Sequence, residues 1–198
     1  MNTNHQNHIL LMALVLFVAG ASLAVYLLVP NAIQILSFSG TTFLQGELWR
    51  MGSFPFTHVS MTHLVENLIA LTIAFLLAWE LELVGTNAFL AFFGASLLVA
   101  LADLVAFPAV ILAGASVGIY ALFGAVAATG SSFVSVRVMM LAFGIPITVR
   151  FLFQALVAHG WLSAALHFVG FLTGIGMTFL LRETMQRNRT RILEVESL

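Results

Sequence analysis

Long apolar segments recur along this chain at the length that a lipid bilayer requires. The first covers residues 9–29, ends before Pro30 and contains no charged residue. A helix rises about 1.5 Å per residue, so about 20 apolar residues cross the hydrocarbon core of a bilayer. Only 8% of the residues are charged, against about 25% in soluble domains. The chain is therefore predicted to be an all-α membrane protein, with lipid as the solvent for most of its surface.

Six membrane-spanning helices are expected, and they form a single domain over residues 9–181. The predicted spans are residues 9–29, 62–83, 88–107, 115–128, 134–157 and 161–181. The segment between the first two spans carries Glu47 and Arg50 and is interrupted by glycine and proline, so it is too polar to cross. Its aromatic residues, such as Trp49, favour the boundary between lipid and water. We therefore expect a bundle of six transmembrane helices with an interfacial loop between helices 1 and 2.

The charges at the two ends predict how the chain is oriented. Residues 1–8 contain no Lys or Arg, so the first span is expected to be a retained helix rather than a signal peptide. Residues 182–198 form an Arg-rich tail next to the last span. Basic residues that flank a span favour the cytoplasmic side. With six spans, both termini are predicted to be cytoplasmic, in a multi-pass protein of the cell membrane whose tail contacts the inner leaflet.

Several classes of function are excluded by what the chain lacks. The net charge of -1 argues against a nucleic-acid partner. There are no cysteines, so disulfides, thiolate metal sites and cysteine nucleophiles are absent. The HExxH pattern of zinc proteases does not occur, and Asp103 is the only aspartate, whereas an aspartyl protease needs two. No metal and no cofactor are expected.

A serine and a histidine are placed where they can meet in the outer half of the membrane. Ser116 opens the fourth predicted span, and His167 lies about two turns into the sixth, which enters from the same side. A serine hydroxyl becomes a nucleophile when a base takes its proton, and histidine suits that task near neutral pH. The alternative is that each side chain is satisfied by its own surroundings, and the spacing alone leaves both interpretations open.

Small residues are spaced so that these two spans can approach closely. Tyr120 and Gly124 share a helix face with Ser116, while Gly170 and Gly174 share a face with His167. Small residues on facing stripes let membrane helices pack at short distance. This pattern favours contact between the serine and the imidazole.

Two further polar residues lie near the outer end of the second predicted span. His63 and Asn67 are four residues apart, so they share one helix face. Both can donate hydrogen bonds, as acyl transfer requires at a developing oxyanion. The alternative is a buried polar pair that joins helices. His58 would not share their face on a continued helix, and it is expected to fasten the interfacial loop to a helix.

The residues around the serine also match a motif of soluble hydrolases, and the match is accidental. Gly114, Ser116 and Gly118 fit the nucleophile elbow of α/β-hydrolases. That motif needs a preceding strand and an acid between the serine and the histidine. No Asp or Glu lies between Ser116 and His167. A serine–histidine dyad is therefore expected.

Taken together, these motifs resemble the rhomboid family of intramembrane proteases over roughly residues 47–177. The resemblance rests on three groups of residues, which are Trp49-Arg50 with His58, His63 and Asn67, then Gly114, Ser116, Tyr120 and Gly124, then His167, Gly170 and Gly174. It implies that Ser116 is the nucleophile and His167 the base, with Asn67, His63 and the Ser116 N–H at the oxyanion. It also implies that Tyr120 packs beside His167, and that Arg50 and its loop steady a lateral entrance for substrate.

One position departs from the family pattern. The family usually has glycine directly after the serine, and this chain has Val117. The added bulk is expected to widen the gap between serine and histidine, alter substrate choice or weaken activity.

The function expected from the sequence is cleavage of transmembrane segments of other membrane proteins near the outer face. The main alternative is an inactive relative that binds membrane segments without cutting them. A third possibility is a small transporter or channel, which the lack of an inverted repeat disfavours. The sequence does not indicate an oligomeric state.

Overall fold

The computed structural model describes residues 3–129 and 161–196, with isolated residues between 135 and 156, and within these it describes side chains from residue 5 to residue 181. Within this part the fold is helical, apart from one isolated bridge between Phe38 and Leu112. Its helices are α1 (Thr3–Leu28), α2 (Ala32–Leu36), α3 (Gly40–Leu44), α4 (Arg50–Ser53), the 3-10 turn η1 (Phe54–Phe56), α5 (Met61–Glu80), α6 (Gly85–Ala106), α7 (Ser116–Thr129) and α9 (Trp161–Glu196).

Four of the described helices are long and apolar enough to cross a membrane. These stretches are His5–Leu28, Met61–Glu80, Gly85–Ala106 and Trp161–Leu181. Each corresponds to a span predicted from hydropathy. The predicted fifth span, residues 134–157, lies outside the continuously described residues, so the count of six remains a prediction.

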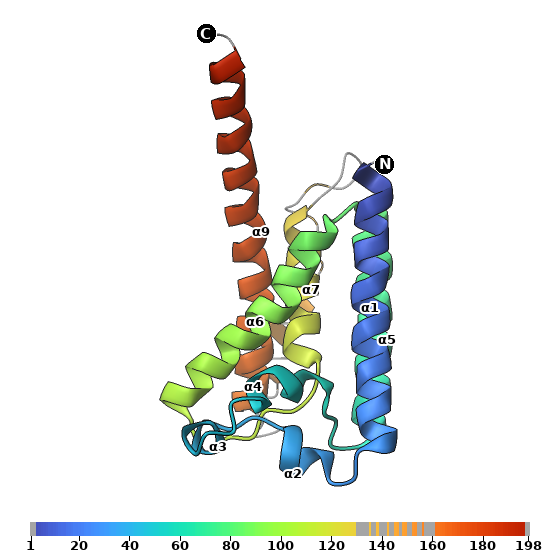
Figure 1. The fold of residues 1–198 in the computed structure, drawn as a ribbon, viewed down its shortest axis with the longest axis vertical. Helices are drawn as coiled ribbons and strands as arrows, with labels where there is room; N and C mark the ends of the chain where they lie inside the picture. The colour runs from blue at the N-terminus through green and yellow to red at the C-terminus, as the bar shows by residue number, and fades with distance from the viewer. Residues whose placement is uncertain are drawn as a thin grey trace.

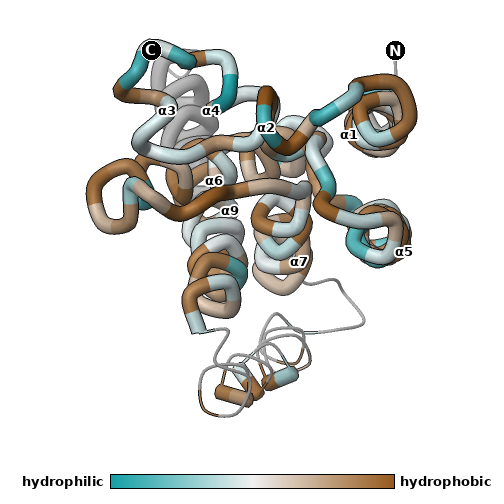
Figure 2. Tube along the Cα trace, turned by 90° about the horizontal axis from the view of Figure 1, so that it is seen from below, coloured by the Kyte–Doolittle hydropathy of each residue, from teal (hydrophilic) through white to brown (hydrophobic). Residues whose placement is uncertain are grey.

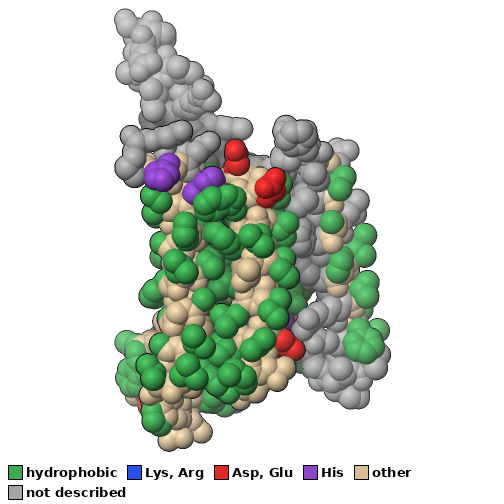
Figure 3. Space-filling view, turned by 90° about the vertical axis from the view of Figure 1, so that its right-hand side faces the viewer, with side chains coloured by type: hydrophobic (Ala, Val, Ile, Leu, Met, Phe, Trp, Pro, Cys, Tyr) green, Lys and Arg blue, Asp and Glu red, His purple; other side chains and the backbone are tan. Residues whose placement is uncertain are grey.

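The long helices stand side by side, and the short ones gather at one end of the bundle. Both chain termini lie at the top in Figure 1, while α2, α3 and α4 lie at the bottom. Seen from that lower end, α1 and α5 lie next to each other and apart from α9 (Figure 2). On the face that α1 and α5 present, apolar side chains cover the middle, while the histidine and acidic side chains in view lie near its upper and lower ends (Figure 3). This distribution suits a surface that contacts lipid.

Helix α7 is the centre of the described bundle. It packs against α5, α6 and α9, and ten of its 14 residues are buried. A helix that is apolar all round is stable only when other helices or lipid surround it. Its first residue is Ser116, so the fold places the serine among neighbouring helices at the end of the bundle that holds the short helices (Figure 1).

Glycines set the distance between α7 and α9. A Cβ atom built on Gly124 would lie 2.0 Å from the Phe171 carbonyl oxygen, and one on Gly174 would lie 1.9 Å from the Ala121 oxygen. At Gly170 the nearest atom would be the Val117 oxygen at 2.7 Å. The two backbones therefore touch along the stripe of small residues, as the spacing predicted.

The predicted interfacial loop, residues 29–60 between α1 and α5 (the interfacial segment), contains short helices that its own side chains hold together. The carbonyls at the end of α2 have no partner within that helix. Three side chains from residues 49–53 donate to them: Trp49 Nε1 to Ile35 at 3.1 Å, Ser53 Oγ to Leu36 at 2.8 Å and Arg50 Nη1 to Ser37 at 3.0 Å. This segment is thus fixed by hydrogen bonds between residues 13 to 17 positions apart.

Some boundaries differ from the predicted ones for identifiable reasons. The turn expected at residues 85–87 lies at residues 81–84, where Glu82 adopts a φ of 53°, and α6 already begins at Gly85. Helix α1 begins at Thr3 instead of residue 9, because its first turns pack on α5 through stacking of His8 on Trp79. Helix α9 continues through the polar tail to Glu196, since residues 182–196 contain neither Gly nor Pro.

Candidate active site

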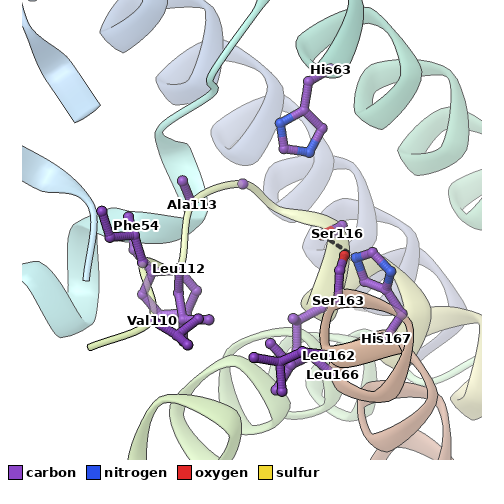
Figure 4. Close-up of a pocket in the computed structure, with 13 residues that line it drawn as sticks. Phe54, His63, Val110, Leu112, Ala113, Ser116, Leu162, Ser163, Leu166 and His167 are labelled. Atoms are coloured by element: carbon purple, nitrogen blue, oxygen red, sulfur yellow. Dashed lines mark hydrogen bonds between the residues drawn. The ribbon is translucent and has the colours of Figure 1, made fainter. Parts of the chain in front are cut away.

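The serine and the histidine meet at the start of α7. Ser116 Oγ lies 2.8 Å from His167 Nε2 (Figure 4), although the two residues are 51 positions apart in the chain. This distance is that of a hydrogen bond between a hydroxyl and an imidazole nitrogen. The contact allows the imidazole to take the proton of the serine hydroxyl as that oxygen attacks a carbonyl.

Tyr120 fixes the plane of the histidine ring. Its ring stacks on the His167 imidazole, with centroids 4.6 Å apart and an angle of 11° between the planes. Tyr120 lies one turn after Ser116 on α7, so one helix supplies both the hydroxyl and the surface on which the imidazole rests. The imidazole is therefore restrained from two sides.

The loop that leads into Ser116 is tied to the interfacial segment by backbone hydrogen bonds. Phe38 and Leu112 exchange two of them, at 3.0 and 2.8 Å, and Gly114 N–H donates to Phe54 at 2.9 Å. Gly114 adopts a φ of 108°, a region that glycine enters without steric cost. These contacts fix the position at which α7 begins.

Donors from α5 face the same loop. A Cβ atom built on Gly114 would lie 2.7 Å from His63 Cε1, 3.1 Å from His63 Nε2 and 3.3 Å from Asn67 Nδ2. Asn67 is buried, and its Nδ2 has no hydrogen-bond partner among the described residues. The first N–H groups of α7, which begins two residues later, also have no partner within the helix. Side-chain donors and a helix N-terminus therefore converge beside Ser116. Such an arrangement can stabilise negative charge that develops on an oxygen atom.

A cavity of about 180 Å³ opens between this loop and the first turns of α9. Ser116, His167 and His63 lie on its wall. The rest of the lining is mainly apolar, from Phe54, Val110, Ile111, Leu112, Ala113, Gly114, Val117, Leu162, Leu166 and the hydroxyl-bearing Ser163 (Figure 4). Apart from Gly114 and Val117, no sequence pattern indicated these wall residues, because most of them come from an irregular loop and from the start of α9. The lining is suited to small or apolar groups.

Val117 does not separate the serine from the histidine. Its carbonyl and its Cγ1 both face Gly170, where a built Cβ would meet them at 2.7 and 3.3 Å. The absence of a side chain on Gly170 accommodates the valine, and the 2.8 Å contact is kept. The expectation that Val117 widens the gap is therefore wrong.

Arg50 and His58 lie away from the reacting groups, in the interfacial segment. Arg50 is buried, pairs with Glu47 and donates to the Ser37 carbonyl. His58 is buried too, with Nδ1 3.3 Å from the Phe56 oxygen and its ring 5.1 Å from that of His63. The chain turns before α5 begins at Met61, so the two histidines are neighbours, which a continued helix would not allow.

One known protein family matches most of the chain. The family model described as Rhomboid domain matches residues 45–184 of the chain. The chain belongs to the rhomboid family. A search of curated proteins finds no match. A rhomboid-family protein with several apolar helices of this length is a multi-pass membrane protein.

We predict that Gly114→Ala lowers the rate of cleavage more than the backbone strain of alanine at a positive φ explains. The new methyl group would meet His63 and Asn67, and a shift of about 1 Å in a reacting geometry can cost about 100-fold in rate. Gly46→Ala is the matched control, since Gly46 has a φ of 96° but no atom near its Cβ position. Both variants should lose roughly 1–3 kcal/mol of stability. Equal cleavage rates for the two variants would contradict the prediction.

The rhomboid fold is also predicted to lose stability as the pH falls, through His58. Burial, with the nearby His63, lowers the pKa of His58 from 6.5 to about 4, although the Phe56 carbonyl acts in the opposite direction. Between these values the unfolded chain binds a proton that the folded chain does not. The contribution of the neutral His58 to the free energy of unfolding is therefore complete above pH 6.5. It falls as the pH approaches 4 and changes no further below that pH. Thermal unfolding in detergent between pH 7.5 and 4 should show a decline that His58→Gln flattens. Identical declines in both proteins would contradict it.

Proposed function

We propose that this rhomboid-family protein is a serine endopeptidase that cleaves transmembrane segments of other membrane proteins. The observation that carries the proposal is the 2.8 Å contact between Ser116 Oγ and His167 Nε2 on the wall of a cavity. Both members of the pair are present, and the imidazole is held flat against Tyr120. An oriented base beside a hydroxyl is the requirement for a serine nucleophile.

In the proposed reaction, a substrate segment enters from lipid and unwinds, because a helical carbonyl is not open to attack. Ser116 Oγ attacks the peptide carbonyl carbon while His167 takes the hydroxyl proton. Asn67, His63 and the Ser116 N–H stabilise the negative oxygen of the tetrahedral intermediate. His167 then protonates the leaving amine, and the C–N bond breaks. Water, deprotonated by His167, hydrolyses the acyl-enzyme and frees Ser116.

The proposed orientation places both termini in the cytoplasm and the cavity toward the outer face of the cell membrane. The two termini lie at the same end of the structure, and the cavity lies at the opposite end, beside the short helices (Figure 1). The arginines of residues 182–191 favour the cytoplasmic side. Lipid and transmembrane proteins are the proposed partners, and no cofactor or metal takes part.

The test uses the full chain, purified and reconstituted in liposomes. A fluorophosphonate probe should label the wild type, and a single-span reporter protein should be cleaved. Ser116→Ala should abolish both. Ser163→Ala is the matched control, because Ser163 lines the same cavity one turn before His167 but is not the serine in contact with it; labelling and cleavage should persist. Labelling that survives in Ser116→Ala would refute the assignment. A wild type that binds the reporter but neither reacts nor cuts would establish the inactive alternative.

A further inference from the structure

A buried histidine, His58, and a half-buried one, His63, lie side by side behind the loop that leads into Ser116. His58 ends the interfacial segment, and His63 lies in the first turn of α5, whose N-cap is Ser60. Their ring centroids are 5.1 Å apart, with the planes inclined by 59°. His63 faces the cavity and Gly114, whereas His58 is only 4% exposed. The pair therefore connects the cavity wall to the interior of the interfacial segment.

The hydrogen bond that His58 makes determines which of its nitrogens carries the proton. Its Nδ1 lies 3.3 Å from the Phe56 carbonyl oxygen, which can only accept. Nδ1 must therefore be the donor. The pKa of about 4 keeps the ring neutral at pH 7, so Nε2 bears a lone pair and no hydrogen. That Nε2 is buried, and it has no hydrogen-bond partner within the described residues.

The position of the hydrogen on the His63 ring follows from the proposed function, and this part of the inference rests on that function. The Cε1–Nε2 edge of His63 faces Gly114 beside the cavity. To donate to an oxyanion there, Nε2 must carry the hydrogen, and a neutral ring then leaves Nδ1 as a bare acceptor. His63 Nδ1 is buried as well, and it lacks a partner in the part of the chain that the structure describes.

Two bare acceptors cannot bond to each other, and each costs free energy while it is unsatisfied. One molecule that donates two hydrogens can satisfy both. A water molecule does so across a gap of about 5–6 Å between two nitrogens, with hydrogen bonds of ordinary length, and ring centroids 5.1 Å apart permit such a gap. Buried water commonly occupies such positions between polar groups of a protein.

We propose that one buried water bridges His58 Nε2 and His63 Nδ1, and that it holds His63 in the tautomer that carries its hydrogen on Nε2. His58 is then a positioning residue: it touches no reacting atom, but through the water it directs the His63 N–H into the cavity. A metal ion is a poorer occupant, because no cluster of three His, Cys, Asp or Glu side chains that could hold one occurs among the described residues.

The direct test is nitrogen NMR of the full chain in lipid with ¹⁵N-labelled histidine, because ring nitrogens with and without hydrogen have distinct shifts. Single variants assign the His58 and His63 signals. We expect His58 with its hydrogen on Nδ1, which is the less common tautomer, and His63 with its hydrogen on Nε2. Magnetisation transfer from water to both bare nitrogens is also expected. A hydrogen on His63 Nδ1 would overturn the proposal, and so would the absence of transfer from water.

Two variants of His58 distinguish its hydrogen-bonding role from the space that its ring fills. His58→Phe keeps a flat ring and removes both nitrogens, so His63 should populate both tautomers, and kcat should fall about 10-fold with KM within about twofold. His58→Gln retains a donor and an acceptor and should restore most of the kcat. An unchanged His63 spectrum in His58→Phe would also refute the bridge. The spectra do not depend on proteolysis, so a wild type that fails to react with the serine probe would refute the proposed function alone.

Discussion

A double variant that lacks both the Ser116 hydroxyl and the His167 imidazole is expected to cleave substrate no more slowly than either single variant. Ser116→Ala removes the attacking oxygen, and His167→Ala removes the group that accepts its proton. Because the two act as one unit across a 2.8 Å contact, the loss of one leaves the other without a role. Each single variant should lower kcat by roughly 10⁴-fold or more, and the double variant should show the same residual rate.

The measurement is initial cleavage of a reporter segment in liposomes for the wild type, both single variants and the double variant. Protein folding is checked by thermal unfolding in detergent, since a small change on the cavity wall should leave the bundle intact. Ser163→Ala serves again as the control for loss of a cavity hydroxyl. Losses that multiply in the double variant would mean that serine and histidine contribute independently, which the proposed mechanism does not allow.

The sequence predicted the long helices well because their signal is local. Hydropathy over about 20 residues is sufficient to place a span. The four described spans lie where hydropathy placed them. The positions of Ser116 and His167 also followed from local rules, namely depth along a helix and small residues at intervals of three or four. The spacing of Gly124 and Gly174 therefore predicted the contact between α7 and α9.

The interfacial segment was not predictable in the same way, because distant residues determine it. The carbonyls that end α2 are satisfied by Trp49, Arg50 and Ser53, which no local pattern pairs with them. The neighbouring positions of His58 and His63 depend on the turn at Ser60 and on contact between the two rings, so spacing on a regular helix was the wrong guide.

Val117 shows why a family pattern does not by itself predict a distance. The valine was expected to widen the gap between serine and histidine, because it adds bulk where the two helices touch. The partner is Gly170, whose backbone receives the Val117 carbonyl and Cγ1. Bulk at one position is offset by a glycine on the facing helix, and only the relative register of α7 and α9 reveals it.

Gly174→Ala is expected to have the largest effect on stability of any single methyl group added to α9. The new Cβ would lie 1.9 Å from the Ala121 oxygen and 2.7 Å from its carbonyl carbon, far inside contact distance. The obstacle is helix backbone on both sides, so α7 and α9 must separate. Overpacking typically costs about 1–3 kcal/mol and occasionally more; we expect about 3 kcal/mol, or a fall in unfolding temperature of roughly 10 °C. Cleavage should fall with it, because the approach of these helices sets the Ser116–His167 distance.

Gly176→Ala is the matched control, because it makes the same substitution two residues later in α9, at a position with no atom within 4 Å of the new Cβ. There the gain in helix propensity, about 1 kcal/mol, acts without a clash, so this variant should be as stable as the wild type or more so. Unfolding temperatures and cleavage rates in the same detergent decide between the two. If Gly174→Ala unfolds at the temperature of Gly176→Ala and retains its cleavage rate, the backbone contact between α7 and α9 does not hold the serine against the histidine.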